Sequence, residues 1–132
     1  MNFKLDKSYK LCSHKVIEAV FEKRQGVKQY PIAMNYLEIA LPTQKSLQFV
    51  FSVPKKRFKR AVDRNRIKRL LREAVRHTKW PLEEFLMQNQ RQIAIFIVYL
   101  ASEEMDYQTL LTKVDQLFQK LKHELEKKEP KL

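Results

Sequence analysis

The sequence predicts an α+β fold, a two-layer α–β sandwich with the element order α-β-β-α-β-α. Three observations predict it. Residues 47–53 alternate apolar and polar side chains with the period of a half-buried strand. Residues 93–100, IAIFIVYL, are apolar throughout, which is typical of a strand covered on both faces. Residues 107–125 place apolar side chains three and four positions apart, the pattern of an amphipathic helix.

The first helix and the strands after it follow from local signals. Ser13 can cap a helix over residues 14–25, and Gly26 stands where a left-handed residue ends a helix. Residues 30–41 are extended in character, and a short turn containing Pro, Thr and Ser separates them from the strand at 47–53. We therefore expect these two strands to form a β-hairpin.

A basic helix comes next. The apolar side chains between residues 67 and 75 form one stripe at helical spacing, so this part can pack on a core. Toward the amino end the same stripe is occupied by Arg64, Asp63 and Arg60. Two alternatives follow: the helix begins near Asp63, which could cap it, or its amino end projects past the core. The pair at 80–81, Trp-Pro, ends it.

The remaining elements complete a single domain over residues 1–132. Residues 81–92 are expected to be a linker or a short extra helical turn before the apolar strand. Asp106 can cap the last helix, and residues 126–132 are expected to be a frayed tail. The length and the hydrophobic content of 44% suffice for one core without disulfides, and no internal repeat is evident.

The excess positive charge lies in one stretch, residues 55–79. Twelve Lys and Arg side chains against two acids leave +10 there, of +12 for the whole chain. Charge gathered on one element predicts a polyanionic partner, and the commonest is a nucleic-acid backbone. The alternative is a passive solvated face, but such faces normally interleave acids, and only Asp63 and Glu73 do so. Charge alone also leaves a membrane surface open.

A soluble, cytoplasmic protein is expected. The single cysteine, Cys12, cannot form an intramolecular disulfide, which suits a reducing compartment. The first fifteen residues contain no apolar core of a signal peptide. The longest apolar run, residues 93–101, is about half of what a membrane-spanning helix needs.

No self-sufficient active site is predicted. His14, His77 and His123 fall on three different expected helices, away from any Cys or carboxylate cluster at ligand spacing, so we expect no metal bound by the protein itself. A single glycine excludes a phosphate-cradling glycine loop. The adjacent acids at 83–84 and 103–104 are interpreted as solvated surface. Any chemistry therefore belongs to a partner.

Four aromatic residues have two possible roles. Phe21, Tyr36, Phe49 and Phe51 stand at spacings typical of core residues. Aromatic side chains that line a groove can instead stack on unpaired bases, as in proteins that bind single strands. Both interpretations stay open at this point.

One motif is more specific than a basic helix in general. A strand that ends in Lys55-Lys56 is followed, from Ala61 to Glu73, by A-V-x-R-N-R-I-K-R-L-x-R-E. This segment resembles the protein component of bacterial ribonuclease P, and the element order and length agree with that family. The resemblance implies a left-handed strand-helix-strand crossover, against the usual right-handed rule.

The resemblance also implies a function and its partners. The protein would be an RNA-binding accessory subunit of a cytoplasmic ribonucleoprotein, an RNA-based endoribonuclease. The RNA would remove the 5′ leader of precursor tRNA by hydrolysis that depends on Mg²⁺, held chiefly by the RNA. The implied partners are the catalytic RNA subunit and precursor tRNA, with no membrane and no obligate protein partner.

Site roles follow by position within the resemblance. Contacts to the RNA subunit would come from the basic segment: Arg60, Arg64, Asn65, Arg66, Lys68, Arg69 and Arg72. The single-stranded leader would lie in a cleft between the first helix and the sheet, at Ile17, Phe21, Tyr36, Ser52, Lys55 and Lys56.

Two positions depart from the family pattern. Ile17 stands where an aromatic residue is usual, one turn before Phe21. Val50 replaces a glycine that is common in the second strand, and it adds bulk on the face opposite Phe49 and Phe51. A leader path on that face would be narrower or differently shaped.

Three rival functions predict different behaviour. A general or ribosomal RNA-binding protein would not prefer leader-bearing tRNA over mature tRNA. A DNA-binding regulator would place the basic helix in a major groove and would normally be two-fold symmetric. A stand-alone nuclease would need a carboxylate or histidine cluster, which the sequence does not show.

Overall fold

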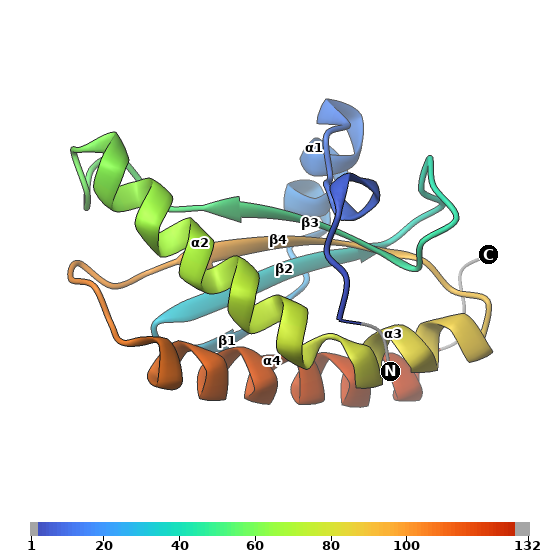
Figure 1. The fold of residues 1–132 in the computed structure, drawn as a ribbon. Helices are drawn as coiled ribbons and strands as arrows, with labels where there is room; N and C mark the ends of the chain where they lie inside the picture. The colour runs from blue at the N-terminus through green and yellow to red at the C-terminus, as the bar shows by residue number, and fades with distance from the viewer. Residues whose placement is uncertain (1–2, 129–132) are drawn as a thin grey trace.

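The computed structural model describes residues 3–128 and contains every element that the sequence predicts, with three additions (Figure 1). The additions are a short 3₁₀ helix η1, a first strand β1 and a helix α3. The elements in chain order are η1 (Lys7–Tyr9), α1 (His14–Lys23), β1 (Gly26–Gln29), β2 (Ile32–Glu38), β3 (Leu47–Ser52), α2 (Ala61–Thr78), α3 (Trp80–Gln88), β4 (Ile93–Tyr99) and α4 (Tyr107–Lys127).

The sheet has the strand order β1-β2-β4-β3, and this order contradicts the predicted hairpin. β4 lies between β2 and β3, antiparallel to the former and parallel to the latter. The reason is burial: β4 is the most apolar strand, and a central position covers both of its faces. The hairpin is formed instead by β1 and β2, around a cis peptide bond between Tyr30 and Pro31.

The parallel pair β3 and β4 is joined by a crossover through α2 and α3. The left-handed sense of this crossover stays a prediction. Helices cover both faces of the sheet, so the expected two layers are three where α1 lies (Figure 1). The larger core packs α2, α3 and α4 against one face, while a smaller cluster, which includes Val20, Leu37 and Ala94, packs α1 against the other.

The end of α1 differs from the prediction. The helix stops at Lys23, and the left-handed residue is Arg24, with φ of 52°. Gly26 is instead the first residue of β1. A Cβ at this glycine would lie 2.9 Å from both the Asn35 side-chain oxygen and the Met34 carbonyl oxygen. The chain's single glycine therefore permits a close approach of β1 to β2 and does not end a helix.

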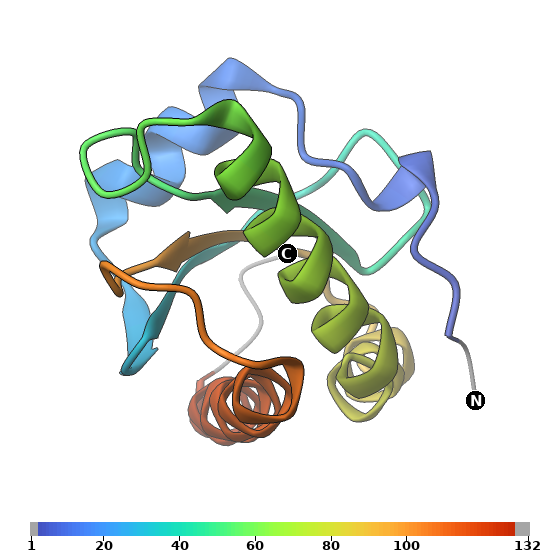
Figure 2. The same ribbon diagram turned by 60° about the vertical axis from the view of Figure 1, so that its left-hand side comes forward.

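The start of α2 resolves the two alternatives for the basic helix. It begins at Ala61, and its N-cap residue Arg60 makes no side-chain capping bond. Full burial begins only at Ile67, so the amino end projects past the core. The helix packs diagonally across the sheet, beside α4 (Figures 1 and 2).

The segment between α2 and β4 contains more helix than a single turn. α3 spans Trp80–Gln88, with Pro81 in its first turn, where a missing N–H costs nothing. The predicted frayed tail is wrong for its first two residues, because α4 extends to Lys127. Residues 129–132 lie outside the described part of the chain.

A buried polar cluster corrects the interpretation of Glu83 as solvated surface. This carboxylate is 2% exposed, accepts a hydrogen bond of 2.6 Å from the Lys79 ammonium and one of 2.5 Å from the Tyr9 hydroxyl. Lys79 is completely buried, so it does not belong to the cationic surface. Burial is tolerable because each charge is paired within hydrogen-bond distance. The cluster joins the amino-terminal segment to the junction of α2 and α3.

Candidate nucleic-acid interface

The outward face of α2 carries the predicted cationic site residues. The side chains of Asn65, Arg66, Arg69 and Arg72 are exposed, and that of Lys68 is half-buried. They lie on consecutive turns because the opposite face of the helix is held in the core by its apolar stripe. The helix thus presents planar guanidinium groups to solvent over about half of its length.

Two of the predicted arginines are already paired with acids. Arg60 contacts Asp63 at 2.9 Å, and Arg66 contacts the same carboxylate at 2.7 Å. Arg66 also forms a two-bond contact with Glu104, in the turn before α4, at 2.6 and 2.8 Å. The Glu104 hydrogen bond raises the pKa of Arg66, and Arg66 in turn lowers the pKa of Glu104. An incoming phosphate must therefore compete with a carboxylate for this guanidinium.

Arg64 has a different local role. Its guanidinium donates hydrogen bonds to the carbonyl oxygens of Phe58 and Lys59, at 2.8 and 2.9 Å. These bonds fold the loop between β3 and α2 back onto the helix. Replacement of Arg64 would therefore disturb the loop as well as the surface charge.

Three cations of α2 remain available. Within residues 3–128, Lys68, Arg69 and Arg72 form no ion pair. Arg72 lies over the ring of Phe51, with 5.7 Å between its guanidinium carbon and the ring centroid. Cations without an acidic partner on one helix face are the groups that a phosphate backbone can neutralise without breaking an ion pair.

The predicted leader residues of α1 meet the sheet on its other face. Phe21 is 48% exposed, and its ring contacts Phe96 of β4 edge to face at 4.7 Å between centroids. Ile17 and Val50 are partly buried in the same cluster. Ser52 faces the same side as Val50 because side chains two apart in a strand share a face. The structure therefore brings Ile17, Phe21 and Ser52 to one surface.

Lys55 and Lys56 extend this surface beyond the sheet. Both are exposed in the loop that follows β3. They add positive charge to the loop that leaves β3 at the end where Ser52 lies. Aromatic rings and cationic side chains on one surface are the groups with which proteins usually bind unpaired nucleotides.

Tyr36 does not belong to that surface, which corrects its assignment to the leader. It is 2% exposed and points to the α4 side of the sheet, with its hydroxyl 2.8 Å from a Glu124 carboxylate oxygen and 3.1 Å from the Lys128 ammonium. Burial, with the bond to Glu124, raises the pKa of the Tyr36 hydroxyl. The cause is strand alternation: Tyr36 shares a face with Met34 and lies opposite Leu37.

Phe96 is the site residue that sequence reasoning missed. It lies in a run in which every position is apolar, so periodicity did not show which side chains face α1. Its exposure to the α1 side follows only from the register of β4 between β2 and β3. The remaining signal was its aromatic character among aliphatic neighbours.

The described part of the chain shows neither a cluster of metal ligands nor a membrane-spanning helix. No group of three or more His, Cys, Asp or Glu side chains in residues 3–128 could hold a metal ion. In the same part of the chain, no helix has both the length and the apolar character to cross a membrane. A mixed sheet that carries an arginine-rich helix face is instead the arrangement of a nucleic-acid-binding protein.

Comparison with known proteins identifies the family. The family model described as Ribonuclease P matches residues 5–122. The chain therefore belongs to the family of bacterial ribonuclease P protein components, the protein subunits of an RNA-based endoribonuclease. Membership implies a role in tRNA 5′ maturation and partnership with the ribonuclease P RNA.

Individual relatives agree with the family. The ribonuclease P protein components of two strains of Porphyromonas gingivalis are 35% identical over 108 residues, which cover 82% of this chain and 79% of theirs. The solved ribonuclease P protein of Staphylococcus aureus has a TM-score of 0.63 at 16% identity, covering 87% of this chain and 96% of the other. A mutant of that protein, described as defective in mRNA degradation, has a TM-score of 0.65 at 18% identity and covers 88% and 90%.

Proposed function

We propose that this protein binds the catalytic RNA through the outward face of α2 and the 5′ leader of precursor tRNA at the surface between α1 and the sheet. By holding both RNAs, this single RNA-binding domain promotes endonucleolytic removal of the leader. The hydrolysis belongs to the RNA, and the Mg²⁺ that it uses is held chiefly there. The protein supplies position and charge.

The observation that carries this proposal is the set of unpaired cations on α2. Lys68, Arg69 and Arg72 lie within about one turn, exposed or half-exposed and free of acids in the described residues. Like charges at such spacing destabilise an isolated helix. A polyanionic partner reverses that effect, because its phosphates neutralise the cations, and the release of counterions from the RNA favours the binding. Arg66 joins this face when a phosphate displaces Glu104.

The surface beside α1 is aromatic where the face of α2 is cationic, and this difference supports its assignment to the leader. The ring of Phe21 is exposed and packs edge to face against Phe96. This contact holds the ring in place and leaves part of it free to stack on a base. Lys55 and Lys56 can follow the phosphates of a single strand beside it. Double-stranded RNA would not present bases to such a ring. Unpaired nucleotides therefore suit this surface best.

The cellular context follows from the same proposal. The holoenzyme works in the cytoplasm, where tRNA precursors are matured, and the exposed Cys12 thiol suits a reducing compartment. No obligate protein partner is required, since both proposed surfaces bind RNA.

The test is cleavage of a precursor tRNA at low magnesium by the protein, the cognate catalytic RNA, and the two together. The expected result is efficient cleavage only in the mixture, because protein cations replace part of the shielding that magnesium otherwise gives. Cleavage by the protein alone would reveal an active site of its own and overturn the proposal. A mixture no better than the RNA alone would favour a general RNA-binding protein, and mature tRNA is the matched competitor that separates the two.

A further inference from the structure

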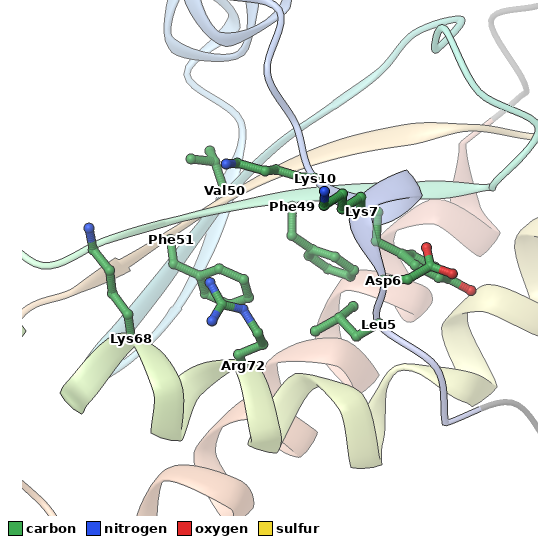
Figure 3. Close-up of a pocket in the computed structure, with 10 residues that line it drawn as sticks. Leu5, Asp6, Lys7, Lys10, Phe49, Val50, Phe51, Lys68 and Arg72 are labelled. Atoms are coloured by element: carbon green, nitrogen blue, oxygen red, sulfur yellow. The ribbon is translucent and has the colours of Figure 1, made fainter. Parts of the chain in front are cut away.

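A pocket of about 590 Å³ opens at the outer edge of the sheet, where β3 faces the amino-terminal segment and α2 (Figure 3). Three segments far apart in sequence line it: the amino-terminal segment before α1, the strand β3, and the middle of α2. Its volume is within the range typical of sites for small organic ligands. The charged and aromatic side chains of the lining include Asp6, Lys7, Lys10, Phe49, Phe51, Lys68 and Arg72.

The pocket exists because the amino-terminal segment follows the edge of β3 and then leaves it. The Leu11 amide donates to the Phe49 carbonyl oxygen at 2.8 Å, and the Gln48 side chain donates to the Ser8 carbonyl oxygen at 3.1 Å. Beyond Phe49, β3 is the outermost strand of the described sheet. The backbone of Phe51 therefore faces the opening, where it can exchange hydrogen bonds with a ligand.

Aromatic rings form one wall of the pocket. The rings of Phe49 and Phe51 lie 6.3 Å apart between centroids and are inclined by only 24°. Phe51 is half-buried, and Arg72 points across its face (Figure 3). An aromatic face beside a guanidinium plane is the combination that holds unstacked bases in RNA-binding proteins.

The charges around the pocket are asymmetric. Cations come from both sides, Lys7 and Lys10 on the amino-terminal segment and Lys68 and Arg72 on α2. The lining contains a single acid, Asp6, which lies at the end opposite Lys68 (Figure 3). Its carboxylate accepts bonds from the Ser8 amide at 2.9 Å and from the Ser8 hydroxyl, and these lower the pKa of Asp6. One end therefore suits a phosphate, and the other suits donor groups.

We propose that this pocket receives one unpaired nucleotide of RNA, with its base against the half-buried Phe51 ring and its phosphate on Lys68 and Arg72. The exocyclic donor groups of the base would lie toward Asp6. The inference rests on the proposed function and deepens it, because it adds a stacking site to the side of α2 that faces β3. The nucleotide comes from the catalytic RNA or from the precursor tRNA, and the test separates these sources.

The test uses Phe51→Leu in the assembled ribonucleoprotein, with Phe3→Leu as the matched control. Phe3 is an exposed phenylalanine that contacts His77 and does not line the pocket. Loss of a stacked base is expected to weaken binding roughly tenfold. Because stacking releases no counterions, the slope of affinity against salt concentration should stay unchanged. Weaker binding of the RNA subunit identifies the catalytic RNA as the source; a raised KM for precursor tRNA alone identifies the precursor.

Unchanged values of both constants in a folded Phe51→Leu protein would overturn the inference while leaving the proposed function in place. If this variant does not fold, Leu5→Trp gives the same test, because it fills the pocket from the amino-terminal segment without altering β3. Failure of the unaltered protein to bind the catalytic RNA would instead overturn the proposed function, and this inference with it.

Discussion

The two proposed RNA surfaces of this protein differ in how they are built. The face of α2 is polar, exposed and supplied by one helix, whereas the surface beside α1 is aromatic, partly buried and assembled from α1, β3 and β4. The first can hold phosphates of any sequence, and its affinity must fall as salt rises. The second can hold bases that are not paired, through stacking on Phe21, and only its Lys55 and Lys56 contacts depend on salt. On these proposed roles, one small domain separates the docking of its RNA from the binding of a single strand.

The largest effect on RNA binding is expected from substitutions on the face of α2. Lys68→Ala with Arg69→Ala should weaken binding of the catalytic RNA roughly ten- to hundredfold, because two charge-assisted phosphate contacts are lost. The salt slope should fall by about 1.4 to 1.8. Binding of the RNA subunit measured over a salt series checks both.

The control for this pair removes the same charge elsewhere. Lys113→Ala with Lys122→Ala, on α4, should leave affinity and slope near those of the unaltered protein. Equal losses in both double variants would mean that net charge, and not this face, determines binding.

The next effect breaks the surface beside α1. Phe21→Ala should raise the KM for precursor tRNA in the assembled enzyme roughly five- to hundredfold, because one stacked base loses its platform. Affinity for the catalytic RNA should not change. Steady-state cleavage of precursors with long and with minimal leaders measures the effect, which should vanish with the minimal leader.

Tyr36→Phe is the matched control for Phe21→Ala. It removes the hydroxyl that contacts Glu124, so the expected change is a loss of about 1 kcal/mol in the free energy of unfolding. KM should stay the same, since the ring is buried on the other face. A raised KM for Tyr36→Phe would restore its assignment to the leader.

The smallest effect on RNA binding is expected at the contact between Arg66 and Glu104. Glu104→Gln should free Arg66 from its two-bond contact and tighten RNA-subunit binding by less than about fivefold, because exposed ion pairs are weak. The pKa of Glu104 is lowered by Arg66, so the pair persists at neutral pH and opens only as the pH falls through that lowered value. The affinity of this variant for the RNA subunit at neutral pH tests whether Glu104 and RNA phosphate compete for Arg66. Weaker binding would show instead that Glu104 positions Arg66 for the RNA.

The α2 face was predictable because its residues are local. A helix of known period turns a run of Arg and Lys into a surface, and the apolar stripe fixes which side faces out. Pairing was not predictable: Arg66 meets Glu104 across 38 positions. The buried cluster of Lys79 and Glu83 was likewise hidden, because exposure of a charge depends on what packs above it.

The surface beside α1 was only partly predictable. That Phe21 and Ser52 share one surface was predictable, since one lies on a short amphipathic helix and the other on an alternating strand, and their role in leader binding stays a prediction. Tyr36 lies on the opposite face because side chains alternate along β2, and Phe96 was missed because its face depends on the register of β4 in the sheet. A strand that is apolar throughout gives no sign of which residues face which helix.

The sequence by itself determined the elements α1, β2, β3, α2, β4 and α4, the cationic face and the family, because each depends on local spacing or on a contiguous motif. Tertiary structure decided the strand order, the third layer, the burial of Tyr36 and the pocket at the edge of β3. These depend on non-local pairing: which strand takes the centre, and which segment lies along the open edge. Burial of the most apolar strand sets the first, and backbone hydrogen bonding of the amino-terminal segment sets the second.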